Sequence, residues 1–120
     1  MISANIKINI GRFVLALIAL HFSYAYAQGN VSGTVISVRV DQDGKGMVVF
    51  DKPVNNSPGC INPAYKSALA FDASTAGGKA IMAMALTAKN TGQIIGAYGS
   101  GACSIYYGNN VEDWYYGNVN

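Results

Sequence analysis

Alternating apolar and polar positions predict a β-hairpin in the first half of the chain. Residues 34–40 repeat with a period of two and are rich in β-branched side chains, which indicates a half-buried strand. One face of this strand carries Thr34, Ile36, Val38 and Val40. Residues 41–46 are rich in Asp and Gly, and the apolar run 47–50 follows them. A strand, a glycine-rich turn and a second strand together predict a hairpin.

The spacing of the apolar positions then changes and predicts a helix over residues 79–90. Its apolar stripe, spaced i, i+3, i+4 and i+7, consists of Ile81, Met84, Ala85 and Ala88. Ser74 or Thr75 can cap the start of the helix, and Gly92 suits the left-handed position after its end.

Further strands are predicted on both sides of this helix. Residues 67–72 form a third strand, residues 93–98 and 103–107 form two more, and residues 111–116 are a candidate for a sixth. The order β-β-β-α-β-β is that of the OB-fold, a small, partly open Greek-key barrel. The expected fold class is therefore mainly β with one helix, built as an OB-fold-like small barrel. An α+β sandwich, with the helix packed on one face of a sheet, is the alternative.

Residues 1–27 are predicted to be a signal peptide. Lys7 and Arg12 form a basic leader, the apolar run 13–20 follows, and Ala25 and Ala27 frame a cleavage site. An uncleaved anchor is the alternative, but the apolar run is short of the roughly twenty residues that span a bilayer. We therefore expect export from a bacterial cell, to the periplasm or beyond, with no membrane span after cleavage.

The composition of the remaining single domain, residues 28–120, excludes several classes of function. The chain has a formal net charge of +2, but this excess and the single histidine, His21, belong to the predicted signal peptide. Without another histidine there is no Ser-His-Asp triad and no imidazole-ligated zinc. The scattered cations offer no basic patch for nucleic acid. We expect no metal, no cofactor and no nucleic-acid partner.

Two segments resemble ligand-binding loops but lack required residues. Residues 41–46 begin like a calcium loop, yet Lys45 and Lys52 stand where oxygen ligands are needed, which favours a turn. Residues 76–79 lie where a phosphate loop would, yet its leading glycine and its Ser/Thr are missing. This segment is interpreted as the start of a helix.

Catalytic carboxylates are also not predicted. Glu112 and Asp113 are adjacent, so on a strand they point to opposite faces and cannot act together on one bond. We expect both to lie on a solvated edge, and we expect the protein not to be an enzyme.

Cys60 and Cys103 are the two cysteines of the chain. In an exported protein a single pair predicts a structural disulfide. A redox pair would need Cys-x-x-Cys spacing, which this chain does not have.

Aromatic side chains gather in the C-terminal quarter, interleaved with Gly and Asn. Neighbours on a strand point to opposite faces, so some of these rings should be exposed. Tyr and Trp combined with Asn and Gly are typical of surfaces that bind sugars or proteins. The candidate ligand-binding residues are Tyr98, Tyr106, Tyr107, Trp114, Tyr115 and Tyr116. The alternative is ordinary packing of the rings, followed by a terminal tail.

The chain has a leader, a long-range cysteine pair and an Ala-rich helix that runs through Thr91 and Gly92 into a strand. Together with the strand order, these features resemble the B subunits of AB5 toxins. The likeness is to the pertussis-like and subtilase-cytotoxin-like branch and to small exported proteins of gammaproteobacteria. It is architectural and covers most of residues 31–107. It implies an OB-fold, a ring of five copies and binding of host glycans, and it assigns no sugar-binding residue.

The leading hypothesis is an exported, non-enzymatic binding module that recognises a glycan or a protein through its aromatic surface. A periplasmic inhibitor or immunity-type protein, and a small structural envelope protein, are the alternatives. A shallow aromatic pocket with Asn or Ser donors would favour a glycan, and a broad flat patch would favour a protein partner.

Overall fold

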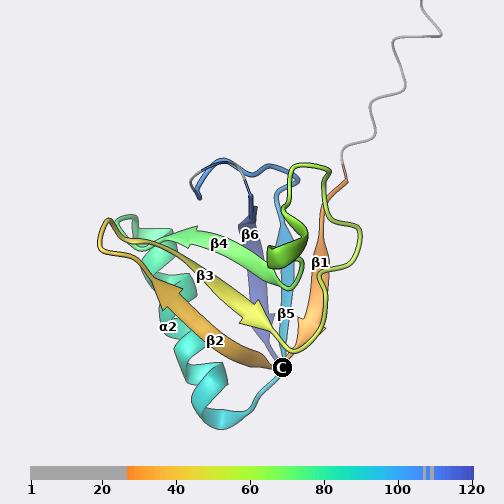
Figure 1. Ribbon diagram of the computed structural model, residues 1–120. Helices are drawn as coiled ribbons and strands as arrows, with labels where there is room; N and C mark the ends of the chain where they lie inside the picture. The colour runs from red at the N-terminus through yellow and green to blue at the C-terminus, as the bar shows by residue number, and fades with distance from the viewer. Residues whose placement is uncertain (1–26, 107, 109) are drawn as a thin grey trace, which may run out of the picture.

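The computed structural model describes residues 27–106, 108 and 110–120 (Figure 1). The predicted signal peptide, apart from Ala27, and the candidate residue Tyr107 lie outside the described residues. The described chain is mainly β, with one α-helix between the fourth and fifth strands. Its elements are β1 (Asn30–Gly33), β2 (Val35–Val40), β3 (Lys45–Phe50), the short 3-10 helix η1 (Pro63–Tyr65), β4 (Ala68–Asp72), α2 (Ala76–Thr91), β5 (Ile95–Gly99) and β6 (Glu112–Val119).

The six strands form one mixed sheet in the order β1-β5-β6-β4-β3-β2. Neighbouring strands are antiparallel except β4 and β6, which run parallel. The hydrogen-bonded sheet is open and is not closed into a barrel. Its two outer strands, β1 and β2, are consecutive in the chain and are separated by Thr34 alone.

The predicted hairpin is confirmed, but the regular alternation predicted for residues 34–40 is interrupted within β2. Val35 is buried, whereas Ile36 and Val40 are exposed. The pairing of β2 with β3 shifts between Val35 and Ser37, and such an irregularity changes the face to which the following side chains point. Of the four side chains predicted to share a face, Val38 is the one that packs against the core cluster.

The predicted helix is confirmed together with its caps. The Thr75 hydroxyl accepts a hydrogen bond from the Gly78 amide, and Gly92 closes the helix in the left-handed conformation at φ 70°. Ala85 and Ala88 of the predicted stripe are buried. A Cβ on Gly78 would lie 1.6 Å from the Asp72 carbonyl oxygen, so glycine lets the helix start directly against β4.

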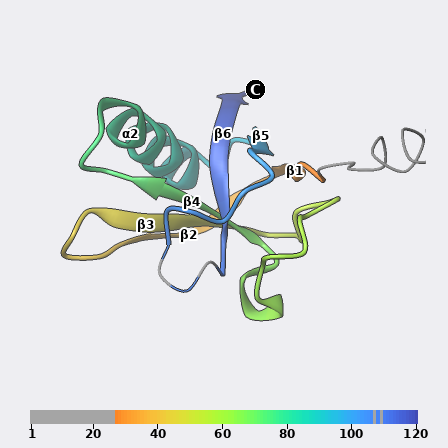
Figure 2. The ribbon, with the colours of Figure 1, turned by 90° about the horizontal axis from the view of Figure 1, so that it is seen from above.

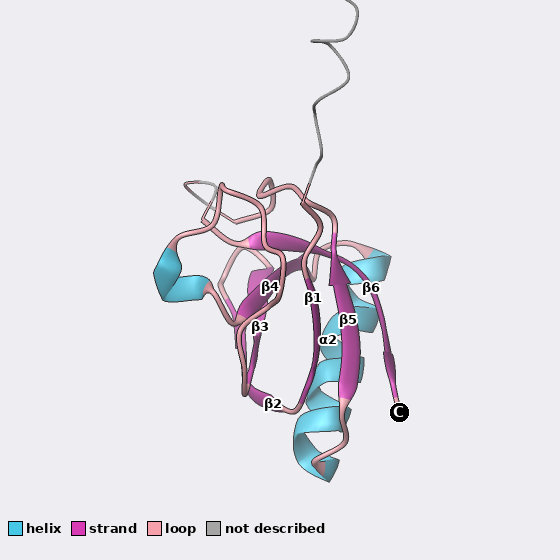
Figure 3. Ribbon diagram, turned by 90° about the vertical axis from the view of Figure 1, so that its right-hand side faces the viewer, coloured by secondary structure: helices cyan, strands magenta, loops and turns pink. Residues whose placement is uncertain are grey.

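The two helices lie on opposite sides of the sheet, with α2 on one side and η1 on the other (Figures 2 and 3). The main core cluster lies on the α2 side and includes Phe50, Leu69 and Trp114. A second, smaller cluster contains Met47 and Tyr106. Within the described residues, no helix is long and apolar enough to cross a membrane.

One predicted strand is absent and one strand was not predicted. Residues 103–106 form a loop, because the amides of Ser104 and Ile105 donate to the carboxylate of Asp113 instead of to a strand. β5 pairs with β6 on one side and with β1 on the other, and the Asn and Gly residues of β1 give little indication of a strand.

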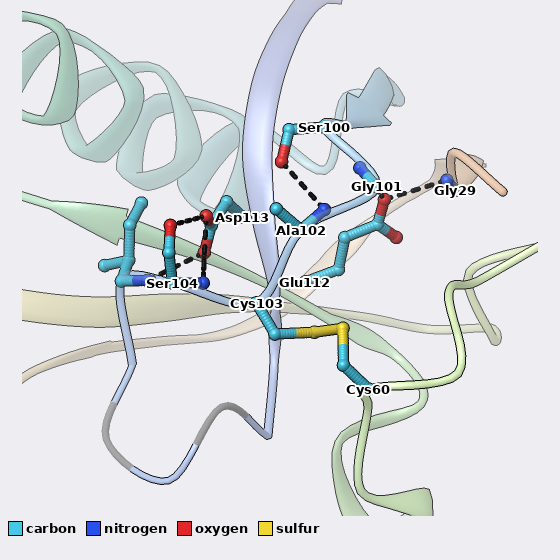
Figure 4. The surroundings of a disulfide bond; sticks show 10 residues. Gly29, Cys60, Ser100, Gly101, Ala102, Cys103, Ser104, Glu112 and Asp113 are labelled. Atoms are coloured by element: carbon cyan, nitrogen blue, oxygen red, sulfur yellow. Dashed lines mark hydrogen bonds between the residues drawn. A yellow bond between two sulfur atoms is a disulfide. The ribbon is translucent and has the colours of Figure 1, made fainter. Parts of the chain in front are cut away.

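The predicted disulfide between Cys60 and Cys103 is confirmed, with an S–S distance of 2.08 Å (Figure 4). It joins residues 43 positions apart and ties the loop before β4 to the loop before β6. In the chain-entropy description, closing a loop of this length contributes about 4 kcal/mol.

Candidate functional site

Three of the candidate aromatic residues come together at the surface of β5 and β6. Tyr98, Tyr115 and Tyr116 are 42%, 68% and 53% exposed, and we call them the tyrosine cluster. The Tyr98 and Tyr116 rings are stacked, with centroids 4.6 Å apart and planes 13° apart. The Tyr115 ring meets the Tyr116 ring edge to face, with centroids 5.6 Å apart.

An irregularity in the pairing of β5 with β6 brings the three rings together. Tyr98 lies opposite Tyr116, but the next pair is Gly99 with Trp114, which leaves Tyr115 as an extra residue on β6. A bulge of this kind bends the strand and redirects a side chain. Because of it, the sequence neighbours Tyr115 and Tyr116 do not point simply to opposite faces, as regular alternation would require.

Polar side chains surround the stacked pair on the same face of the sheet. Residues paired across strands share a face, and so do residues two positions apart on one strand. Tyr98 pairs with Asn30 of β1, and Gly96 pairs with Ser32 and with Asn118. Asn30, Ser32 and Asn118 are exposed, so amide and hydroxyl groups flank the two rings.

A groove lies between the first half of α2 and β6. The parallel pairing of β4 with β6 covers Glu112 and Asp113 alone, so the rest of β6 is paired with β5 on one side. Two hollows, of about 370 and 330 Å³, occupy this region. Both are lined by Gly77, Ile81 and Tyr115. The tyrosine cluster therefore borders a concave surface.

Trp114 forms part of the groove but is a core residue. It is 6% exposed, and its ring is stacked on Phe50 with centroids 6.0 Å apart. A Cβ on Gly117 would lie 2.6 Å from its Cζ2 atom, so the ring lies against the β6 backbone. Trp114 is therefore not on an exposed binding surface, and the alternative of core packing applies to this residue.

The end of the groove near the start of α2 is polar. Asp72 and Thr75 line the first hollow. The hydroxyl and amide of Ser74 both donate to Asp72 Oδ1, at 2.6 and 2.9 Å, and these bonds hold the pKa of the Asp72 carboxyl below its usual range. Asp72 is therefore ionised at neutral pH and is a hydrogen-bond acceptor.

Tyr106 lies apart from the tyrosine cluster and is buried. Its hydroxyl donates to Asp41 Oδ2 at 2.5 Å, and the guanidinium of Arg39 lies 5.6 Å from its ring centroid. The pKa of Tyr106 is raised to about 12, mainly by burial and next by the hydrogen bond to Asp41. Tyr106 thus joins its loop to the hairpin turn and contributes nothing to the groove.

The expectation that Glu112 and Asp113 lie on a solvated edge is wrong, because both are buried. They leave β6 in different directions, as adjacent strand residues should (Figure 4). Glu112 Oε2 accepts from the amides of Gly29 and Gly101, both at 2.9 Å. Asp113 accepts from the amides of Ser104 and Ile105 and from the Ser104 hydroxyl. Backbone N–H groups replace the water that these carboxylates lose.

The groove also contains residues that the sequence pattern assigned to the helix alone. Ile81 and Met84 were expected as core positions and Thr75 as a cap. Each keeps that role and also lines the groove. No feature of the sequence separates a helix face that covers a sheet from one that borders an open space.

Comparison with known proteins gives no match to a family model, to a curated protein or to a solved structure.

Proposed function

We propose that the protein is an exported, non-enzymatic binding module that holds a glycan against the tyrosine cluster. The observation that carries this proposal is the stacked, exposed pair of Tyr98 and Tyr116, with Tyr115 beside it. Large apolar rings are seldom left exposed together in a soluble domain unless they contact a partner.

The chemistry of the cluster suits a saccharide. A tyrosine ring offers a flat apolar face for the C–H groups of a sugar and a hydroxyl at its tip. The Tyr98 and Tyr116 rings are already held by their mutual stacking, so binding restricts little further motion. Asn30, Ser32 and Asn118 place amide and hydroxyl groups beside the rings, where sugar hydroxyls can be hydrogen-bonded.

The groove gives the ligand a second place to bind. Hollows of about 370 and 330 Å³ are within the size range of small-ligand sites, about 300–1,000 Å³. Tyr115 belongs to both the cluster and the groove, so one saccharide chain can contact both. Asp72 at the polar end supplies an acceptor for sugar hydroxyls.

The fold proposal consistent with this function is an OB-type topology whose first strand is broken at Thr34. If β1 and β2 are counted as one broken strand, the two parts of that strand form the two ends of the sheet order. The helix then lies between the third and fourth strands, as in the OB order, and OB-folds bind oligosaccharides and oligonucleotides.

The resemblance to AB5 B subunits adds a ring of five copies, which light scattering tests by a mass near five processed chains. A monomer would remove the ring from the proposal.

A panel of immobilised neutral, acidic and amino-sugar oligosaccharides tests the binding proposal. We expect at least one to be bound, and we expect Tyr115→Ala or Tyr116→Ala to weaken binding about 30-fold, the loss typical of a 2 kcal/mol anchor. Ile36→Ala is the matched control, because Ile36 is an exposed apolar residue on β2, outside the groove.

Two results would contradict the glycan proposal. Equal binding by the tyrosine variants and the control would place the ligand elsewhere. Failure to bind any oligosaccharide, with a protein partner captured by the same cluster, would favour the inhibitor or immunity-type function instead.

A further inference from the structure

The carboxylate of Glu112 is buried and incompletely paired. Glu112 is 1% exposed, and its Oε2 atom accepts two backbone hydrogen bonds. Its Oε1 atom is also buried and has no hydrogen-bond partner among the described residues. Burying an ionised carboxylate is costly unless it is both paired and hydrogen-bonded. A positive group beside Oε1 would remove most of this cost.

The unpaired oxygen lies against the backbone at the start of β1. A Cβ on Gly29 would be 2.2 Å from Glu112 Oε1, and a Cβ on Gly99 would be 2.0 Å from Oε2. Two glycines therefore allow the backbone to approach the carboxylate from both sides. Gly29 also donates its amide to Oε2, at 2.9 Å.

The predicted cleavage site is one residue away from this contact. Cleavage after Ala27 would make Gln28 the first residue, and its nitrogen is three bonds from the Gly29 amide nitrogen. Standard backbone dimensions place two such nitrogens at most about 3.7 Å apart, so the Gln28 nitrogen is within about 7 Å of Oε2. The Ala27 carbonyl oxygen would lie 2.9 Å from a Cβ on Gly101, whose amide also binds Glu112.

We propose that removal of the leader creates an α-ammonium group on Gln28 that pairs with the Glu112 carboxylate through Oε1. An export endopeptidase would hydrolyse the bond between Ala27 and Gln28. Water supplies OH to the Ala27 carbonyl carbon and H to the Gln28 nitrogen, which takes up one further proton at neutral pH. Ala27 leaves as a carboxylate with the leader.

The new ion pair would fasten the start of β1 to β6 in the processed protein. Once the preceding residue has gone, rotation about the Cα–C bond of Gln28 can turn the ammonium toward Oε1 without moving Gly29. The precursor has an uncharged amide at this position, and within the described part of the chain nothing pairs with Glu112 Oε1. This inference rests on the proposed export, and it goes beyond the binding of a ligand.

The test uses the full chain expressed with its leader and processed by the host. Insertion of one Ser between Ala27 and Gln28 moves the ammonium one residue away from Glu112. We expect this insertion to lower the Tm by about 5–10 °C, as loss of a partly buried ion pair should in a domain of this size. In the Glu112→Gln background the same insertion should change the Tm by no more than about 2 °C. Equal changes in both backgrounds would overturn the pairing.

A second measurement does not depend on the Glu112→Gln variant being folded. The α-amine of the processed protein should be acylated about tenfold more slowly at neutral pH than that of the Ser-inserted protein, because an ion-paired ammonium resists deprotonation. Equal acylation rates would overturn the proposal. Intact mass identifies the first residue, and a retained leader or a cyclised Gln28 would overturn it too. Neither of those results bears on glycan binding by the tyrosine cluster, which the oligosaccharide panel tests separately.

Discussion

Truncation of Trp114 tests the conclusion that this residue belongs to the core. Trp114→Ala removes a ring that is stacked on Phe50 and packed against the β6 backbone at Gly117. A Trp side chain buries about 200 Å², which at about 25 cal/mol/Å² corresponds to about 5 kcal/mol. This is an upper value, because unfolded chains already bury part of their apolar surface. We expect the free energy of unfolding to fall by about 3–5 kcal/mol.

Urea denaturation followed by circular dichroism measures this loss, because the variant has no tryptophan fluorescence. Domains of this kind are stable by about 5–15 kcal/mol, so Trp114→Ala can approach complete unfolding. Trp114→Phe provides a milder second variant, which should lose less because a ring still stacks on Phe50. Tyr115→Ala is the matched control on the next residue, and its exposed ring should cost less than about 1 kcal/mol.

Wild-type fluorescence gives an independent check, since a buried Trp114 should emit at short wavelength. A loss below about 1 kcal/mol in Trp114→Ala, together with red-shifted wild-type emission, would refute the core position. It would also return Trp114 to the exposed binding surface.

Three further predictions concern the scaffold. Cys60→Ser should lower the free energy of unfolding by about 4 kcal/mol in urea denaturation. Intact mass with and without reduction should show one disulfide in the wild type, and two free thiols would contradict the bond. Gly78→Ala should destabilise the protein by at least about 2 kcal/mol, because the new Cβ would meet a carbonyl oxygen. Gly77→Ala is the control, and it should stabilise by about 0.5–1 kcal/mol because there is open space around Gly77. Equal effects of the two substitutions would contradict the close approach at Gly78. The raised pKa of Tyr106, about 12, means that folding favours its neutral form, so its stabilisation is complete below pH 10 and is lost as the pH rises toward 12. Between pH 10 and 12 the denaturation midpoint should fall less in Tyr106→Phe than in the wild type. An equal fall in both proteins would refute the raised pKa of Tyr106.

The sequence by itself was sufficient for the elements whose determinants are local. The helix followed from its apolar period and from its caps at Thr75 and Gly92, since capping and helical spacing act within a few residues. The hairpin followed from two β-branched runs around a glycine-rich turn. The disulfide followed from the count of cysteines, because two cysteines allow one pairing.

Strand β1 was decided by the tertiary structure. Its four residues, Asn30–Gly33, have weak strand propensity, and they form a strand because β5 offers a partner. The loss of the expected strand at 103–106 has the complementary cause, since Asp113 takes the amides of that segment. Asp113 lies nine residues after Ser104, and a side chain that competes with a strand for backbone donors leaves no periodic signal in the sequence.

The tyrosine cluster and the buried carboxylates also depend on the tertiary structure. The aromatic composition indicated that some rings would be exposed, but the pairing shift beside Gly99 decided that Tyr115 joins Tyr116 and Tyr98 while Trp114 enters the core. Glu112 is buried where two other segments of the chain meet it, and it accepts hydrogen bonds from their amides at Gly29 and Gly101. Periodicity records which way a side chain points along a regular strand; it does not record where pairing becomes irregular or which distant backbone groups approach, and those two features determine this site.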